Sequence, residues 1–189
     1  ALAGIAVNSV GHCHPLVVKA ITEQAGRLMH ITNIFHNDVQ AEFAELLTSI
    51  SGFDKVYFCN SGLEANEGAI KLARKWGALH KDGAFEIITF ENSFHGRTLA
   101  TMSASGKPQF EALFEPKVDG FKKAVLNDID SVKRLLTEKT VAVMVEPVQG
   151  DVAPAPGTEA LVFTSQNAIQ QVAERCEIRA LPTICVGEK

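Results

Sequence analysis

The sequence predicts an α/β domain built on a mostly parallel sheet with helices on its faces. Three short apolar segments have the composition of buried strands, at residues 56–59, 86–90 and 141–145. Segments with apolar residues at intervals of three and four, which are typical of helices, separate them. Strands that alternate with helices pair in parallel, and such sheets bind their ligands beyond the carboxyl ends of the strands.

Two amphipathic helices are predicted near the start of the chain, over residues 16–29 and 38–50. Pro15 suits the first position of the first helix, because that position needs no amide donor. Asp38 has the side chain of an N-cap for the second helix. A further short helix is predicted over residues 127–136, ahead of the last strand.

The predicted strand at residues 56–59 runs directly into a turn and a helix over residues 64–76. Asn60 and Ser61 have side chains that bond nearby backbone, and Gly62 is free to adopt positive φ. A small-residue turn that opens a helix gathers N–H groups at the positive end of the helix dipole, where phosphate binds well. The alternative is an ordinary turn in which Ser61 acts only as the N-cap.

Composition excludes several classes of partner. The chain has 189 residues, of which 46% are hydrophobic, enough for one domain with a core. A net charge of −4 gives no reason to expect a nucleic acid or a membrane surface, and no apolar run approaches the roughly 18 residues of a membrane span. The four cysteines lack C-x-x-C spacing, so we expect free thiols in the cytoplasm and no metal site. Because the first residue is not Met, we expect the chain to begin inside a larger protein.

Polar clusters follow all three predicted strands, at residues 60–66, 92–98 and 146–151. Because the carboxyl ends of parallel strands meet at one edge of a sheet, we expect the clusters to form one site. Phe94, His95 and Arg97 offer an aromatic face, an imidazole and a guanidinium, and Glu146 offers a carboxylate. With the phosphate turn, these groups indicate an aromatic, phosphorylated cofactor beside an anionic substrate. The alternatives are core packing for Phe94 and solvation for Arg97.

At these clusters the chain resembles the class III, fold type I pyridoxal-phosphate aminotransferases, and in particular the acetylornithine and ornithine aminotransferase branch. The matching blocks are G-I-A-V-N (4–8), G-H-C-H-P (11–15), C-N-S-G-L-E-A-N (59–66), S-F-H-G-R-T (93–98) and E-P-V-Q-G (146–150). The order and spacing agree over residues 1–153. The resemblance implies that these residues form the N-terminal part of the large cofactor-binding domain, incomplete here, and that residues 154–189 are a divergent or unrelated tail.

The resemblance also implies roles for individual residues. The implied ligands of pyridoxal 5′-phosphate are Ser61, Gly62, Leu63, Phe94, His95 and Glu146. The first three would hold the phosphate, Phe94 would stack on the pyridine ring, and His95 and Glu146 would lie near the ring. Arg97 would bind the substrate carboxylate as a bidentate pair, and His36 would face the substrate.

The family resemblance implies transamination of acetylornithine, or of an ornithine-like amino acid, with 2-oxoglutarate by a homodimer in arginine biosynthesis. The chain departs from the family pattern at Leu63, where Thr is usual, and at Asp151, where Glu is usual. It also has no counterpart of the lysine that forms the Schiff base, nor of the aspartate that binds the pyridine nitrogen. We therefore expect little or no turnover from this chain alone, and name no catalytic residue in it.

Two alternatives stay open. In the first alternative, the chain is a non-catalytic fragment that acts by associating with another chain. An unfinished parallel sheet has an open edge, with which another strand can pair. In the second, it is a fusion, because residues 161–168, 181–182 and 186–189 resemble pieces of a uroporphyrinogen-III synthase. Generic helix-capping chemistry explains the same tail residues equally well.

Overall fold

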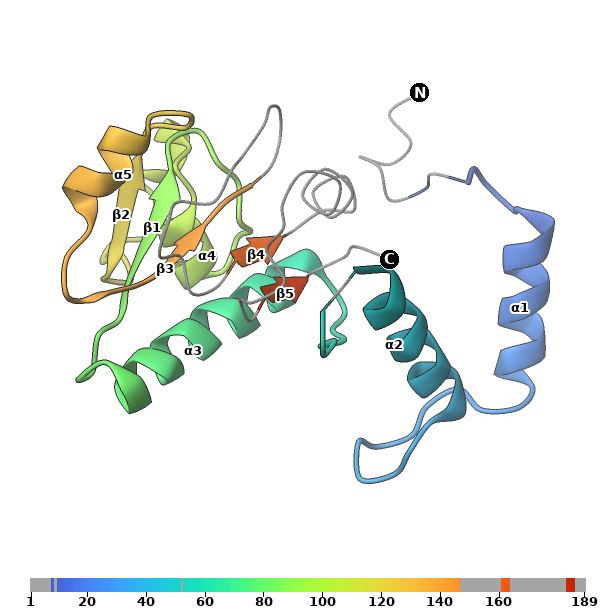
Figure 1. Ribbon diagram of the computed structural model, residues 1–189. Helices are drawn as coiled ribbons and strands as arrows, with labels where there is room; N and C mark the ends of the chain where they lie inside the picture. The colour runs from blue at the N-terminus through green and yellow to red at the C-terminus, as the bar shows by residue number, and fades with distance from the viewer. Residues whose placement is uncertain (1–7, 9, 52, 147–160, 164–182, 186–189) are drawn as a thin grey trace. The chain divides into compact units, whose positions relative to one another are not determined.

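The computed structural model describes residues 8, 10–51, 53–146, 161–163 and 183–185 (Figure 1). The chain divides into two compact units, Ala1–Leu46 and Leu47–Glu188, which we describe separately. Helix α1 (Pro15–Ala25) and most of helix α2 (Asp38–Ser51) belong to the first unit. Among the described residues, no helix combines the length and the apolar character that crossing a membrane would require.

The second unit is a parallel α/β arrangement, as the sequence predicted. Its elements are α3 (Gly62–His80), β1 (Glu86–Phe90), α4 (Leu99–Ala104), the 3₁₀ helix η1 (Pro108–Phe110), β2 (Phe121–Ala124), α5 (Ile129–Leu135), β3 (Thr140–Met144), β4 (Leu161–Phe163) and β5 (Thr183–Cys185). The strand order is β2-β1-β3-β4-β5, and every pair is parallel. Ile88 of β1 pairs with Lys122 on one side and with Val143 on the other.

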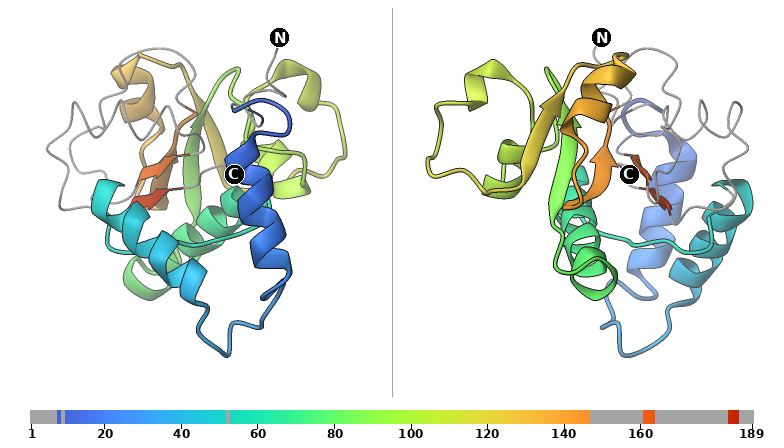
Figure 2. Two further views of the ribbon diagram at one scale, coloured as in Figure 1. Left: turned by 90° about the vertical axis from the view of Figure 1, so that its right-hand side faces the viewer. Right: turned by 60° about the vertical axis from the view of Figure 1, so that its left-hand side comes forward.

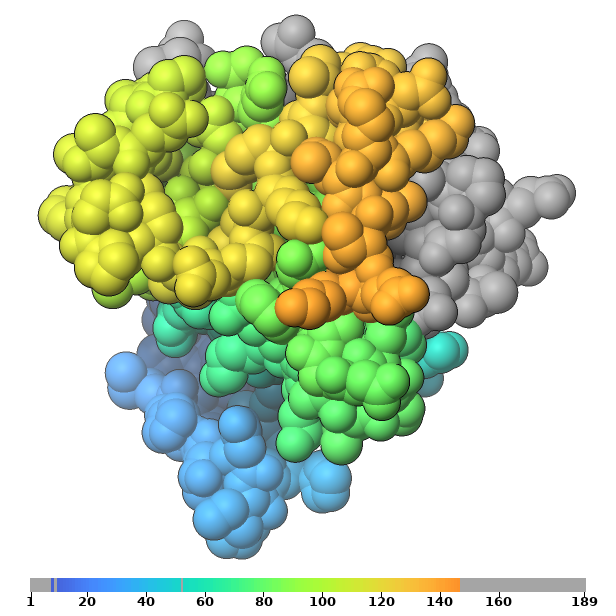
Figure 3. All heavy atoms as spheres, turned by 90° about the vertical axis from the view of Figure 1, so that its left-hand side faces the viewer, coloured from blue at the N-terminus to red at the C-terminus, as the bar shows by residue number. Residues whose placement is uncertain are grey.

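Helices cover both faces of this sheet, so β1 is buried on each side (Figure 2). Ile87 packs in a cluster with Ile70 of α3 and Ala104 of α4. Ile88, its neighbour, points to the opposite face and packs in a second cluster with Val132 of α5. Figure 3 shows one side of the unit filled by atoms of β2, α5 and the loop that precedes β2.

One glycine allows the close approach of α3 to the sheet. A Cβ atom on Gly77 would lie 2.0 Å from the carbonyl oxygen of Ala84 and 2.6 Å from a methyl group of Val141. Any larger residue would therefore push the helix away from β1 and β3. This contact fixes the far end of α3 against the sheet.

Two of the strand predictions are confirmed and one is wrong. The strand at residues 86–90 is β1, and that at residues 141–145 is β3 displaced by one residue. Residues 56–59 form no strand, and the side chain of Tyr57 is 59% exposed. Apolar composition does not suffice there, because these residues pair with no strand of the described sheet. Strand β2 was missed, because lysines occupy two of its four positions at the edge of the sheet.

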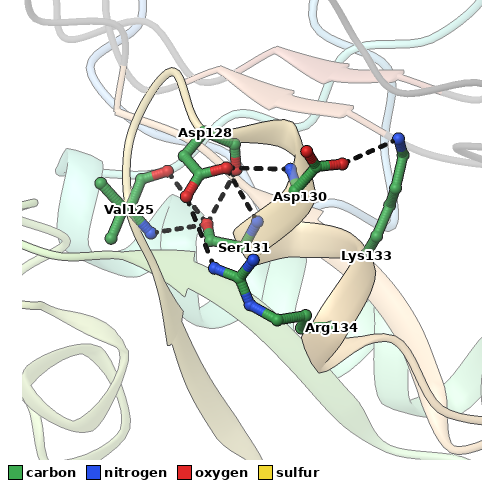
Figure 4. A network of polar contacts seen from close by, with 6 residues as sticks. All are labelled: Val125, Asp128, Asp130, Ser131, Lys133 and Arg134. Atoms are coloured by element: carbon green, nitrogen blue, oxygen red, sulfur yellow. Dashed lines mark hydrogen bonds and ion pairs between the residues drawn. The ribbon is translucent and has the colours of Figure 1, made fainter.

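Helix α5 is fixed to the end of β2 by the capping network drawn in Figure 4. The Asp128 carboxylate accepts hydrogen bonds from the N–H groups of Asp130 and Ser131, both at 3.0 Å, and lies 3.5 Å from Nη2 of Arg134. The hydroxyl of Ser131 accepts a bond from the N–H of Val125 at 2.9 Å. These contacts satisfy donors at the helix start that would otherwise lack partners.

The Asp128→Ala variant is expected to lower the free energy of unfolding by about 1 kcal/mol, because it removes the N-cap. Asp128→Asn is the matched control, since Asn caps helices about as well as Asp. Urea unfolding followed by circular dichroism measures both. Equal stability of the wild type and the Ala variant would contradict the capping role.

Candidate active site

The carboxyl ends of β1 and β3 lie side by side, because the two strands are parallel neighbours. The segment after β1 contains Phe94, His95 and Arg97, and the segment after β3 contains Glu146. The start of α3 joins them through the hydrogen bonds described below. The structure thus brings residues 60–66, residues 92–98 and Glu146 to one edge of the sheet. Residues 147–151 of the third predicted cluster lie outside the described residues.

The first turn of α3 carries open backbone donors. Ser61 is the N-cap, and its hydroxyl accepts a hydrogen bond from the N–H of Glu64 at 3.3 Å. The N–H groups of Gly62 and Leu63 have no partner within the described part of the chain. They lie at the positive end of a 19-residue helix, where an anion is favoured.

The carboxylate of Glu64 already lies at the edge of this turn. It accepts hydrogen bonds from the N–H of Asn60 at 2.7 Å, from the Asn60 side-chain amide at 3.2 Å and from the Ser61 hydroxyl at 3.3 Å. These hydrogen bonds, chiefly those from Asn60, lower the pKa of Glu64. The Ser61 hydroxyl is therefore shared, and the backbone of Gly62 and Leu63 offers the unshared donors.

Leu63 packs toward the segment after β1. A Cβ atom on Gly96 would lie 3.2 Å from Cγ of Leu63 and 2.7 Å from the hydroxyl oxygen of Thr101. Gly96 also has φ +129°, a conformation that side chains disfavour. Only glycine fits between these neighbours, and its contact with Leu63 joins the first polar cluster to the second.

The second cluster is joined to the third by a hydrogen bond from the N–H of Phe94 to Oε2 of Glu146, at 2.7 Å. Burial raises the pKa of Glu146, and this hydrogen bond and the charge of Lys107 oppose the rise. Phe94 is 36% exposed, and Nζ of Lys107 lies 5.1 Å from the centroid of its ring. Phe94 is thus a partly open aromatic surface, and not a residue of the closed core.

His95 is almost completely buried, with 1% of its surface exposed. The backbone N–H of His95 donates to the hydroxyl of Ser105 at 2.8 Å, and its backbone carbonyl oxygen accepts a bond from Nδ2 of Asn66 at 2.7 Å. Both ring nitrogens lack a partner within the described residues. Burial lowers the pKa of His95 to about 4, and the positive charge of Lys123 adds to the effect. The imidazole is therefore neutral at pH 7, with a nitrogen left for a polar ligand atom.

The two predicted substrate-binding residues have different settings. Arg97 is exposed, and its guanidinium makes no hydrogen bond or ion pair with any residue that the structure describes. It is therefore available to a carboxylate from outside. His36 is exposed in the connection between α1 and α2, in the first unit, whereas the other predicted site residues belong to the second unit. Its role stays a prediction.

Sequence reasoning missed several residues that support the site. Asn66 lies within a matching block, and its buried amide could have been noticed there. Lys123 gave no signal, because β2 was not predicted. Its Nζ donates to the hydroxyl of Thr89 at 2.8 Å and to the carbonyl oxygens of Ser103, at 2.7 Å, and Ala104. These bonds tie β1, β2 and α4 together behind His95, and burial lowers the pKa of Lys123 to about 8.

Acid is expected to destabilise the second unit through His95. The folded pKa of about 4 lies below the ordinary 6.5, so the unfolded chain binds a proton more tightly between these values, and stability is lost as the pH falls through this window. From pH 7 to pH 5 the loss due to His95 is about 2 kcal/mol. Urea unfolding at both pH values should show a smaller loss for His95→Gln than for the wild type. An equal loss in both proteins would show that His95 does not titrate this way.

The chain is similar in sequence to known proteins. The family model of the class-III aminotransferases matches residues 1–177, and this match confirms the family resemblance. The matched range includes part of the segment that was predicted to be a divergent or unrelated tail. Acetylornithine aminotransferase 2 of Bordetella parapertussis is 57% identical over 155 residues, which are 82% of this chain and 39% of that protein. Acetylornithine aminotransferase of Methanocaldococcus jannaschii is 52% identical over 152 residues, or 79% of this chain and 38% of that protein. The division at residue 153 stays a prediction.

Solved structures agree in fold. The ornithine aminotransferase of Toxoplasma gondii ME49 aligns with a TM-score of 0.74 at 31% identity, over 97% of this chain and 43% of that one. The acetylornithine aminotransferase of Elizabethkingia anophelis aligns with a TM-score of 0.63 at 35% identity, over 97% of this chain and 44% of that one. The chain thus spans about two fifths of the length of the curated relatives that it matches. It belongs to the class-III aminotransferase family.

Proposed function

We propose that this chain supplies the part of an aminotransferase that binds the cofactor phosphate and the substrate carboxylate. The reaction proposed is transamination of acetylornithine, or of an ornithine-like amino acid, with 2-oxoglutarate in arginine biosynthesis. The names of the relatives support this choice. One observation supports the combined binding site: the segment after β1 is hydrogen-bonded both to α3, through Asn66 and His95, and to Glu146 after β3.

Pyridoxal 5′-phosphate is the cofactor that membership of this family indicates. When bound, it supplies the electron sink that amino-group transfer requires. The residues present fit this group, since the open N–H groups of Gly62 and Leu63 suit a phosphate and the Ser61 hydroxyl lies beside them. Phe94 would cover the aromatic ring. The buried, unpartnered nitrogens of His95 suit a polar atom of the cofactor.

The remaining side chains handle charge. Arg97 would take the substrate carboxylate in two parallel hydrogen bonds, a geometry that Lys cannot reproduce. Glu146 orients Phe94 through the 2.7 Å bond to its N–H. Because burial raises the pKa of Glu146, this carboxyl accepts a proton more readily than an exposed one.

We further propose that the parent protein is a cytoplasmic homodimer. Cys13 and Cys59 are free thiols, which supports a reducing compartment. Within the first unit, Leu16 and Ile21 of α1 leave apolar side chains exposed, which supports association with another surface.

The site of phosphate binding is tested by comparing Leu63→Thr with Leu63→Val. The two variants have the same shape at this position, and they differ only in that Thr has a hydroxyl where Val has a methyl group. The Thr variant is expected to bind pyridoxal phosphate about tenfold more tightly, since a hydrogen bond to a charged group contributes roughly 1.5–3 kcal/mol. Fluorescence titration measures the two dissociation constants. Pyridoxal, which lacks the phosphate, is the control ligand and should not distinguish the variants; equal affinities for pyridoxal phosphate would count against the site.

The 189-residue polypeptide alone is expected to bind pyridoxal phosphate but to form no glutamate from acetylornithine and 2-oxoglutarate, because no lysine in it matches the family's Schiff-base position. A coupled glutamate assay measures the turnover. Light scattering with and without the cofactor measures the oligomeric state and distinguishes the enzyme-derived site from the non-catalytic fragment. The fragment alternative predicts association that does not depend on the cofactor. Steady glutamate production would overturn the expectation.

A further inference from the structure

Asn66, in the second turn of α3, reaches across to the segment after β1. Its side chain is buried, with 3% of its surface exposed, and Nδ2 donates to the carbonyl oxygen of His95 at 2.7 Å. Water cannot replace this bond at a buried position, so the loss of the amide would leave the carbonyl oxygen without a partner. Asn66 therefore ties the backbone between Phe94 and Gly96 to the helix whose start offers the open N–H groups.

Glu67, the next residue, makes a second tie three residues further along the same segment. Its Oε1 accepts a hydrogen bond from the hydroxyl of Thr98, which is the N-cap of α4. The hydroxyl of Thr98 also accepts from the N–H of Thr101 at 3.2 Å, and the N–H of Thr98 donates to the hydroxyl of Thr101 at 2.9 Å. Glu67 thus accepts the hydrogen bond that the Thr98 hydroxyl donates, and a lone pair of the hydroxyl oxygen stays available to accept the bond from the helix N-terminus.

Arg97 lies between these fixed points. Gly96, on one side, is enclosed by Leu63 and Thr101, and Thr98, on the other side, is held by Glu67. The Arg97 guanidinium itself has no partner among the described residues. The backbone that carries the guanidinium is therefore fixed, while the charged end stays free for a ligand.

We propose that Glu67 is a positioning residue, which through Thr98 holds Arg97 at a set distance from the phosphate-binding start of its own helix. The inference rests on the proposed function, in which α3 binds the cofactor phosphate and Arg97 binds the substrate carboxylate. One rigid helix then fixes both anion-binding points. A small displacement of Arg97 weakens carboxylate binding strongly, because a bidentate pair requires close alignment, and leaves the phosphate donors untouched.

Matched variants isolate the tie. Thr98→Val keeps the shape of the side chain and removes the hydroxyl, whereas Thr98→Ser keeps the hydroxyl. Glu67→Met keeps the length of the side chain and removes the acceptor oxygen, whereas Glu67→Gln keeps an acceptor. Glu138→Gln, at an exposed carboxylate on the turn before β3, controls for the change of surface charge.

Hydrogen exchange of the full 189-residue chain is the first readout. Amides of residues 96–98 are expected to exchange at least fivefold faster in Thr98→Val and Glu67→Met than in the wild type. Exchange in Thr98→Ser, Glu67→Gln and Glu138→Gln should stay within twofold of the wild type. Wild-type exchange rates in both Thr98→Val and Glu67→Met would overturn the proposal.

Ligand affinity is the second readout. Glutarate, a dicarboxylate that cannot react, is titrated against the chain loaded with pyridoxal phosphate. Thr98→Val and Glu67→Met should weaken glutarate binding about tenfold and change pyridoxal phosphate binding by less than twofold. Equal losses of both affinities would show a general structural role and refute positioning. Failure of the wild type to bind pyridoxal phosphate would refute the proposed function instead, and the exchange rates would still decide whether the tie exists.

Discussion

The parallel pairing of β1 with β3 is the constraint from which the candidate site follows. Parallel neighbours end at the same edge of a sheet, so the chain leaves both strands at one place. Burial on both faces fixes this pairing, since Ile87 and Ile88 belong to different clusters on opposite sides of β1. A shift of one residue in register would move each of them to the wrong face. The polar segments that carry Phe94 and Glu146 are therefore held together by the pairing of two apolar strands.

Contacts between the segment after β1 and α3 add a second level of order. Several of the buried polar residues that the structure describes lie in this region, among them Asn66, His95 and Ser105. The side chains of Asn66 and Ser105 bond to the backbone of His95, in a segment that has no regular structure of its own. A loop held by buried side-chain bonds keeps its shape without belonging to a sheet or helix. This explains how a segment that contains a buried imidazole can also expose Arg97.

Much of this arrangement could be predicted from the sequence. The parallel sheet, the strand β1 and the clustering of polar groups at strand ends followed from apolar periodicity and general rules for α/β folds. The strand predicted before α3 was wrong, because Tyr57 and its neighbours have the composition of a strand but no strand with which to pair. Strand β2 and Lys123 were missed because lysines in a sequence usually indicate solvated surface. Only the tertiary contacts show that the ammonium group of Lys123 has three acceptors. The packing of Leu63 against Gly96 was equally beyond a pattern, since it joins residues 33 positions apart.

The central claim is that the start of α3 receives the phosphate of the cofactor. Amide resonances of Gly62 and Leu63, followed by ¹H–¹⁵N NMR during titration with pyridoxal phosphate, test it most directly. These two resonances should shift and their hydrogen exchange should slow, because the N–H groups gain a charged acceptor, and an equal concentration of pyridoxal should leave them unchanged. Binding of pyridoxal phosphate with no change at Gly62 and Leu63 would contradict the account.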